Sequence, residues 1–185
     1  MKQFQQKGFE VVKGYIPPQF SSYLRNYFVT LADNEQLRGD SQAPNSHCVY
    51  GDLAFDMVMA MSTNSIGEFV GKKLLPQYTY ARIYNKGSVL KRHTDRPECE
   101  YSVTLSLGGQ YDQLWPIWIK DFDGNDHCVE LDEGDMLVYS GCELEHWRDK
   151  FEGEAQCQLF MHYVDLDGKY KDRILDGRPH LGFKK

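Results

Sequence analysis

Short β-type runs separated by turn residues fill the chain after Pro76, and this pattern constrains the fold more than any other feature of the sequence. Each run is rich in β-branched, aromatic and other apolar residues, and the segments between them carry Gly, Asp, Asn and Ser. This texture is typical of an antiparallel sandwich or barrel. The predicted strands cover residues 78–84, 101–107, 114–120, 127–131, 135–141 and 155–164.

The second of these runs, residues 101–107, reads YSVTLSL, so apolar and hydroxyl side chains alternate along it. Successive side chains of a strand point to opposite faces of its sheet. One face of this strand is therefore predicted to be apolar and the other polar, and the polar face is suited to line a cavity.

The N-terminal part has a different character. Residues 8–16 predict a short strand that ends at Pro17-Pro18, because proline lacks the donor that a strand needs. A helix is expected to follow, with Ser21 or Ser22 as its N-cap and an apolar stripe at helical spacing from Tyr23 to Leu31.

A loop over residues 39–46 is expected to lead into a second amphipathic helix over residues 56–75, with a break at residues 62–65. No internal repeat, low-complexity tract or linker is present. We therefore expect one α+β, mainly β domain over residues 1–185, with a helical part at about 18–75 and a β core at about 76–165.

Composition narrows the function classes. The 21 Lys and Arg residues are outnumbered by 27 Asp and Glu residues, the net charge is −6, and no dense basic stripe is present. Proteins that hold phosphate backbones usually need such a stripe, so nucleic acid is not the expected partner. Five cysteines without a CxxC pair favour reduced thiols. Without a signal-like or membrane-length apolar run, we expect a cytoplasmic protein with no membrane partner.

The strongest candidate for chemistry is the segment His93-Thr94-Asp95. In an extended segment the His-x-Asp spacing places both side chains on one side. The spacing alone occurs by chance, but His93 here follows a predicted strand and precedes the half-polar strand 101–107. His146 follows several further strands, so antiparallel crossings can return it beside the first two residues.

Two imidazoles and one carboxylate form the facial triad of non-haem Fe(II) oxygenases, which leaves coordination positions open for a bidentate co-substrate and O2. Zinc accepts the same ligand set, so the residue types alone leave the metal open.

The segments YARIYNKGSVLKRHTDRPECEYSVTLSLGG and GDMLVYSGCELEHWRDKFEGEAQCQLFMHYV resemble the Fe(II)/2-oxoglutarate-dependent dioxygenases, particularly the branch related to prolyl 4-hydroxylases. The segment FEVVKGYIPPQFSSYLRNYF is similar to the N-terminal strand and helix of that family. The resemblance implies a double-stranded β-helix (jelly roll) with N-terminal helices packed on one face.

The resemblance also implies roles for individual residues. His93, Asp95 and His146 would be the catalytic ligands of Fe(II), and Tyr84 would hydrogen-bond the co-substrate 2-oxoglutarate. One departure matters: the family commonly places Arg or Lys on the last strand to pair with the far carboxylate of 2-oxoglutarate, and residues 155–158 here read AQCQ.

A buried dicarboxylate without a cationic partner would be costly, so another group must replace the missing one. Arg148 is the first candidate because it lies two residues after His146 and projects to the same face if the strand continues. Arg96 and Arg82 are the alternatives. Neutral donors such as Ser102, Thr104 or Gln158 could also serve, or the co-substrate could be a different one.

The expected function is hydroxylation of an unactivated C–H bond with O2, Fe(II) and 2-oxoglutarate. The substrate could be a small molecule or a protein side chain, and the sequence does not identify it or the oligomeric state. A non-catalytic, cupin-like jelly-roll module that binds a metal or ligand is the alternative. An oxidative nucleic-acid demethylase fits the acidic charge balance poorly.

Overall fold

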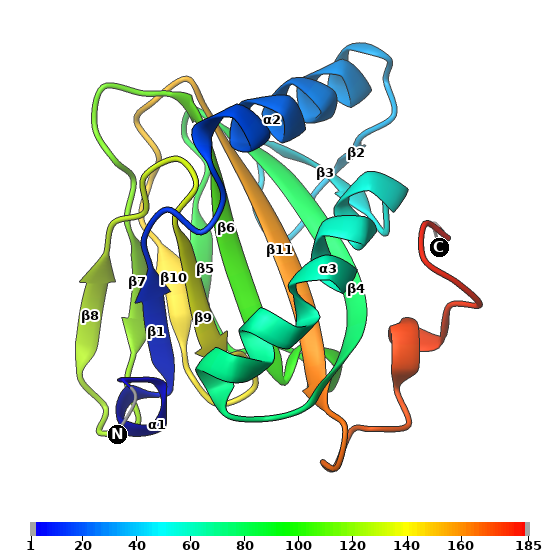
Figure 1. Ribbon diagram of the computed structural model, residues 1–185. Helices are drawn as coiled ribbons and strands as arrows, with labels where there is room; N and C mark the ends of the chain where they lie inside the picture. Colours follow the sequence, from blue (N-terminus) through cyan, green and yellow to red (C-terminus); the bar gives the residue numbers. More distant parts are fainter. Residues whose placement is uncertain (1–2, 184–185) are drawn as a thin grey trace.

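The computed structural model describes residues 3–183 and places the strands in two antiparallel sheets (Figure 1). The order in the larger sheet is β1 (Phe9–Val12), β9 (Met136–Ser140), β6 (Tyr101–Gln110), β11 (Ala155–Asp165), β4 (Leu74–Asn85), β3 (Ser46–Tyr50) and β2 (Arg38–Gly39). The order in the smaller sheet is β5 (Leu90–His93), β10 (His146–Arg148), β7 (Ile117–Lys120) and β8 (Asp126–Val129).

The chain passes back and forth between the two sheets. It runs from β4 in the larger sheet to β5 in the smaller one, back to β6, across to β7 and β8, back to β9, across to β10 and back to β11. This alternation is the double-stranded β-helix that the sequence predicted, and it confirms the mainly β fold class. Its consequence is that β5 and β10, far apart in the sequence, pair directly.

The helices are α1 (Gln3–Lys7), α2 (Pro18–Asp33) and α3 (Leu53–Val70), with short 3-10 turns η1 (Pro97–Cys99) and η2 (Ile174–Gly177). Figure 1 shows α2 and α3 against one face of the larger sheet. None of the helices within residues 3–183 combines the length and the apolar character needed to cross a bilayer.

Two details of the predicted helices were wrong. Helix α2 begins at Pro18, with Pro17 as its N-cap, and Ser21 is buried inside it. Proline suits the first helical turn because that turn leaves N–H groups without partners in any case. Helix α3 has no break at residues 62–65, since Thr63 and Ser65 donate their hydroxyls back to carbonyls of the preceding turn.

Helix α3 is bounded by identifiable residues. The Asp52 side chain accepts a hydrogen bond from the Ala54 amide at its start, and Gly71 ends it with a φ of 74°. The chain then enters β4 at Leu74, within the stretch predicted as helix. Strands β2 and β3 also fall in the region predicted as helical, and β1 is shorter than the predicted strand over residues 8–16.

Both faces of β6 are buried, one in the hydrophobic core and the other in a polar interior. Val103, Leu105 and Leu107 are fully buried in the same core as Phe28 and Phe55 of the helices. The hydroxyl residues at 102, 104 and 106 are also fully buried and lie on the opposite face, toward the smaller sheet. The alternation in the sequence therefore separates a hydrophobic core from a polar interior.

That one domain spans residues 1–185 stays a prediction, and residues 1–2 and 184–185 lie outside the described range.

The segment after β11 is tied to the fold by a buried ion pair. Arg178 donates to Asp56 of α3 at 2.7 Å, and both side chains are fully buried. Asp56 also accepts hydrogen bonds from Thr79 of β4 and from the amide of Gly182. The pair thus links the C-terminal segment, α3 and β4.

We expect Asp56→Ala to lower the free energy of unfolding by about 3 to 5 kcal/mol, because it leaves the Arg178 cation buried without a carboxylate to neutralise it. Urea denaturation measures this loss. Glu154→Ala is the matched control, since it removes an exposed ion pair with Lys86 and should cost less than about 1 kcal/mol. Equal effects of the two substitutions would contradict the structural role of the buried pair.

Candidate metal centre and its cavity

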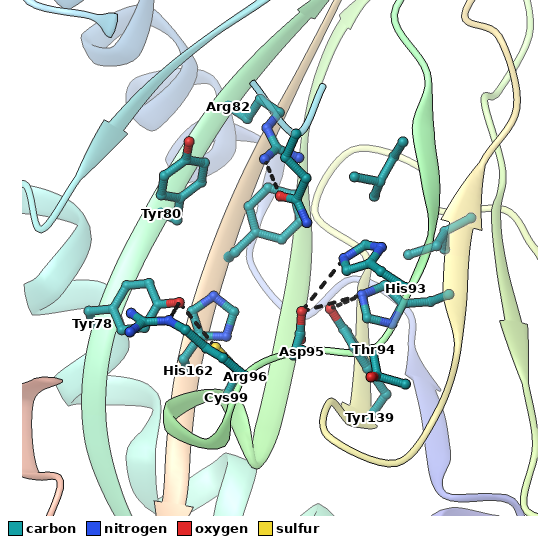
Figure 2. Close-up of a pocket in the computed structure, with 15 residues that line it drawn as sticks. Tyr78, Tyr80, Arg82, His93, Thr94, Asp95, Arg96, Cys99, Tyr139 and His162 are labelled. Carbon is teal, nitrogen blue, oxygen red and sulfur yellow. Dashed lines mark hydrogen bonds and ion pairs between the residues drawn. The ribbon is translucent and has the colours of Figure 1, made fainter. Parts of the chain in front are cut away.

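A cavity of about 370 Å³ opens between the two sheets, and residues from both line it (Figure 2). The larger sheet contributes aromatic and polar side chains from β4, β9 and β11, and the smaller sheet contributes the two histidines. The lining side chains used below are Gln42, Tyr78, Tyr80, Arg82, His93, Asp95, Arg96, Cys99, Tyr139, His146 and His162.

His93, Asp95 and His146 meet at the wall of this cavity. His93 ends β5, His146 begins β10, and the two residues lie opposite each other in the antiparallel ladder. Their ring centroids are 4.3 Å apart. Oδ1 of Asp95 lies 3.7 Å from Nε2 of His93 and 3.6 Å from Nε2 of His146, as the dashed lines from Asp95 in Figure 2 show.

Backbone carbonyls fix the tautomer of both histidines. Nδ1 of His93 lies 2.7 Å from the carbonyl oxygen of Lys91, and Nδ1 of His146 lies 3.0 Å from that of Leu144. A carbonyl oxygen only accepts, so each Nδ1 carries the hydrogen and each Nε2 keeps its lone pair. Burial also lowers the pKa of His146, which favours the neutral ring. Two Nε2 atoms and a carboxylate oxygen thus lie within reach of one metal ion.

Arg148 lies two residues after His146 on β10 and is fully buried, but it is not among the residues that line the cavity. Its Nη1 donates to the carbonyl of Trp115 at 2.6 Å, and its guanidinium lies over the Trp115 ring. Nε and Nη2 have no hydrogen-bond partner among residues 3–183. Burial lowers the pKa of Arg148 to about 10, so the group is still charged at neutral pH. A buried guanidinium with two free donors is a site for an anion.

Arg82 is already neutralised. Its Nε donates to Asp40 at 2.7 Å, and its Nη2 donates to Gln42 at 2.8 Å. Its Nη1 donates to the hydroxyl of Tyr84 at 2.7 Å. Because the Tyr84 oxygen accepts this bond, its own hydrogen is left to donate to another acceptor.

Arg96 is also paired. It donates to Asp176 through both terminal nitrogens, at 3.1 and 3.0 Å, and it forms an ion pair with Glu98. Its side chain is about half exposed. Arg148 is buried like Arg82, but it differs from both alternatives in lacking a carboxylate partner within the described chain.

Positions 156 and 158 of β11 lie where the family commonly has Arg or Lys, and here they carry buried glutamines. Oε1 of Gln158 accepts from Thr104 at 2.9 Å, and its Nε2 has no partner among the described residues. Gln156 donates to Ser106 at 3.3 Å. The interior between the sheets is thus polar along β6 and β11 as well as around Arg148.

Sequence reasoning missed several residues of the cavity. Asp40 and Gln42 come from the predicted loop over residues 39–46, and nothing local marks them as partners of Arg82. Tyr78 and His162 could have been found, because they continue the inward-facing alternation of β4 and β11. Ser102 was named as a possible co-substrate donor, and its hydroxyl instead donates to Asp95 at 2.7 Å.

No protein-family model matches the sequence, and a search of curated proteins gives no significant match. Solved structures do match. A prolyl-4-hydroxylase from Pseudomonas putida is 16% identical with a TM-score of 0.72, covering 88% of this chain and 95% of the other. A Trichoplax adhaerens prolyl hydroxylase in complex with a peptide fragment of hypoxia inducible factor is 14% identical with a TM-score of 0.74, covering 95% and 90%.

HygX from Streptomyces hygroscopicus, solved with nickel, 2-oxoglutarate and hygromycin B, is 16% identical with a TM-score of 0.68, covering 89% of this chain and 85% of the other. The similar structures also include an epimerase and a carbocyclase from nogalamycin biosynthesis. At these identities the likeness concerns the fold. The fold of this chain is that of the Fe(II)/2-oxoglutarate oxygenases, with the prolyl hydroxylases among the similar structures.

We expect His93→Ala, Asp95→Ala and His146→Ala each to lose stoichiometric binding of a divalent metal while the protein stays folded, since the three residues lie at a cavity wall. Asp95→Asn should weaken binding because the amide has the size of the carboxylate but not its charge. Isothermal titration calorimetry with Fe(II) or Co(II) under anaerobic conditions measures the affinity of each variant for the metal.

His47→Ala is the control, because His47 is exposed and lies outside the cavity. Tight binding of one metal equivalent by any of the three alanine variants would remove that residue from the ligand set.

Proposed function

We propose that the chain is an Fe(II)/2-oxoglutarate-dependent oxygenase whose iron ligands are His93, Asp95 and His146. The observation that carries the proposal is the convergence of two imidazole Nε2 atoms and one carboxylate oxygen at a cavity wall, in a fold shared with oxygenases of this kind. Three protein ligands on one face of an octahedral ion leave three positions for a bidentate keto acid and O2.

Arg148 is the proposed partner of the far carboxylate of 2-oxoglutarate. It lies two residues from His146 on the same strand face, which is a step of about 6.5 Å along a strand. Its two free donors suit a planar carboxylate, and the anion would neutralise a buried cation. Tyr84 supports the same assignment, because its hydroxyl is oriented by Arg82 and can donate its hydrogen.

The chain's own residues would then prepare the site in three ways. The carbonyls of Lys91 and Leu144 hold the imidazoles in the ligating tautomer. Asp95 supplies one negative charge toward the divalent ion, and Leu90, Ile117 and Phe160 give the cavity an apolar part suited to a C–H substrate. When bound, iron with 2-oxoglutarate and O2 supplies an oxidant able to remove hydrogen from an unactivated C–H bond.

Hydroxylation is the reaction that we propose for this oxidant, with a small molecule or a protein side chain as substrate. The similar structures support both substrate types, since one was solved with a peptide and another with hygromycin B. They also include an epimerase and a carbocyclase. Analysis of the reaction product therefore distinguishes hydroxylation from epimerisation or ring closure. The reading as an oxidative nucleic-acid demethylase is not favoured, because the net charge is −6.

The rival proposal is a non-catalytic jelly-roll module that binds a metal or ligand without turnover. An oxygenase should form a visible charge-transfer band when Fe(II) and 2-oxoglutarate are added without O2, and should release succinate when O2 is admitted. His146→Ala should do neither. A parent protein that binds Fe(II) but shows no band and no succinate would favour the rival.

Arg148→Ala should raise the 2-oxoglutarate concentration needed for half-maximal band formation by about 10- to 100-fold, while Fe(II) binding is unchanged. This range corresponds to the loss of a charge-assisted hydrogen bond of about 1.5 to 3 kcal/mol. Anaerobic titration of the iron-loaded protein with 2-oxoglutarate measures it.

Arg96→Ala and Arg82→Ala provide the comparison, because both arginines already have carboxylate partners. An unchanged requirement in Arg148→Ala, with an increase in one of the other two, would transfer the role to that residue.

A further inference from the structure

A second group of potential metal ligands lies beside the first. Asp95, Cys99 and His162 also bring one ligand atom each within 4.8 Å of one another. All three line the cavity, and Figure 2 shows Cys99 and His162 together with Tyr78 on the side of Asp95 away from His93. The hydrogen bonds within this group decide whether it is a metal site or a support for Asp95.

Ser102 provides the link between Asp95 and His162. Its Oγ lies 2.7 Å from Oδ2 of Asp95 and 3.0 Å from Nδ1 of His162. Neither the carboxylate of Asp95 nor the carbonyl of Cys99, which lies 3.3 Å from the same Oγ, can donate, and the shorter contact assigns the single hydroxyl hydrogen of Ser102 to Asp95. The contact with His162 then requires that Nδ1 of His162 carries a hydrogen and donates it to Ser102.

Hydrogen bonds engage one atom of each side chain: Nδ1 of His162, the hydroxyl of Ser102, Oδ2 of Asp95 and the thiol of Cys99. His162 is buried and donates to Ser102, Ser102 donates to Oδ2 of Asp95, and Cys99 lies 3.0 Å from the hydroxyl of Tyr78. Oδ2 of Asp95 is occupied while Oδ1 remains directed at His93 and His146.

Gly141 shows how closely this group is packed. A Cβ atom at this position would lie 2.5 Å from Oγ of Ser102 and 2.7 Å from Oδ2 of Asp95, and it would also meet the carbonyl of Cys99. The carbonyl of Gly141 in addition accepts the amide of Asp95 at 2.8 Å. The backbone and the carboxylate of Asp95 are thus both held at the point where Ser102 reaches it.

We propose that Ser102 and His162 are positioning residues that fix the carboxylate of Asp95, so that Oδ1 alone serves the metal, and that Asp95, Cys99 and His162 are not a second metal site. The inference rests on the proposed function, because it assigns a task to these residues only if Asp95 binds metal. Hydrogen-bonded partners of metal ligands commonly change metal affinity by about 10- to 100-fold when removed.

Co(II) titration of the folded protein without 2-oxoglutarate tests this. The parent should bind one equivalent, and Ser102→Ala should bind it about 10- to 100-fold more weakly with an altered Co(II) absorption spectrum. Ser106→Ala is the matched control: it removes a fully buried hydroxyl from the same face of the same strand, at a position that does not contact Asp95. It should retain the parent's affinity and spectrum.

His162 supplies a second, independent pair of variants in case Ser102→Ala does not fold. The side-chain nitrogen of asparagine lies at the position of Nδ1 of histidine, so His162→Asn can keep the donor to Ser102, whereas His162→Leu cannot. We expect His162→Leu to weaken Co(II) binding and His162→Asn to restore much of it.

The outcomes distinguish a failure of the proposed function from a failure of the positioning role. A parent that binds no Co(II) would overturn the proposed function together with the positioning role. A parent that binds one equivalent, with Ser102→Ala or His162→Leu binding equally well, would overturn the positioning role alone. A second equivalent that is lost in Cys99→Ala would show instead that the group is a metal site.

Discussion

The pairing of β5 with β10 is the constraint on which the site depends. It sets His93 opposite His146 in the ladder of the smaller sheet, although the chain visits the larger sheet twice between them. Side chains alternate along a strand, so a register shift of one residue would turn either imidazole away from the cavity. The hydrophobic core behind the larger sheet therefore serves the site indirectly, because it holds in register the strands to which the smaller sheet is connected.

The sequence predicted best what depends on local period. The alternation in residues 101–107 predicted a polar interior face, and the same period gave the His-x-Asp pair and the projection of Arg148. It predicted less well where non-local partners decide. Strand β3 forms because β4 is available to pair with it, and helix α3 passes through residues 62–65 because their hydroxyls bond to helix carbonyls.

The three candidate arginines also show which features local spacing predicts and which depend on distant segments. The sequence named Arg82, Arg96 and Arg148 as candidates, and ordered them only by spacing from other residues. Their different surroundings come from distant segments: Asp40 reaches Arg82 from the loop before β3, and Asp176 reaches Arg96 from η2. No rule of spacing predicts these pairings, because each depends on how a connecting segment folds over the sheets.

The buried arginines differ in whether a carboxylate balances their charge. Arg82 and Asp40 are both buried and neutralise each other, and burial of the Asp56 and Arg178 pair is balanced in the same way. Arg148 is as buried as these groups, yet among residues 3–183 its hydrogen-bond acceptor is the carbonyl of Trp115 alone. A fold that compensates its other buried arginines and leaves this one with two free donors has a place for an external anion. Arg148 lies two residues after His146 on β10, so the same strand carries a candidate metal ligand and the uncompensated guanidinium.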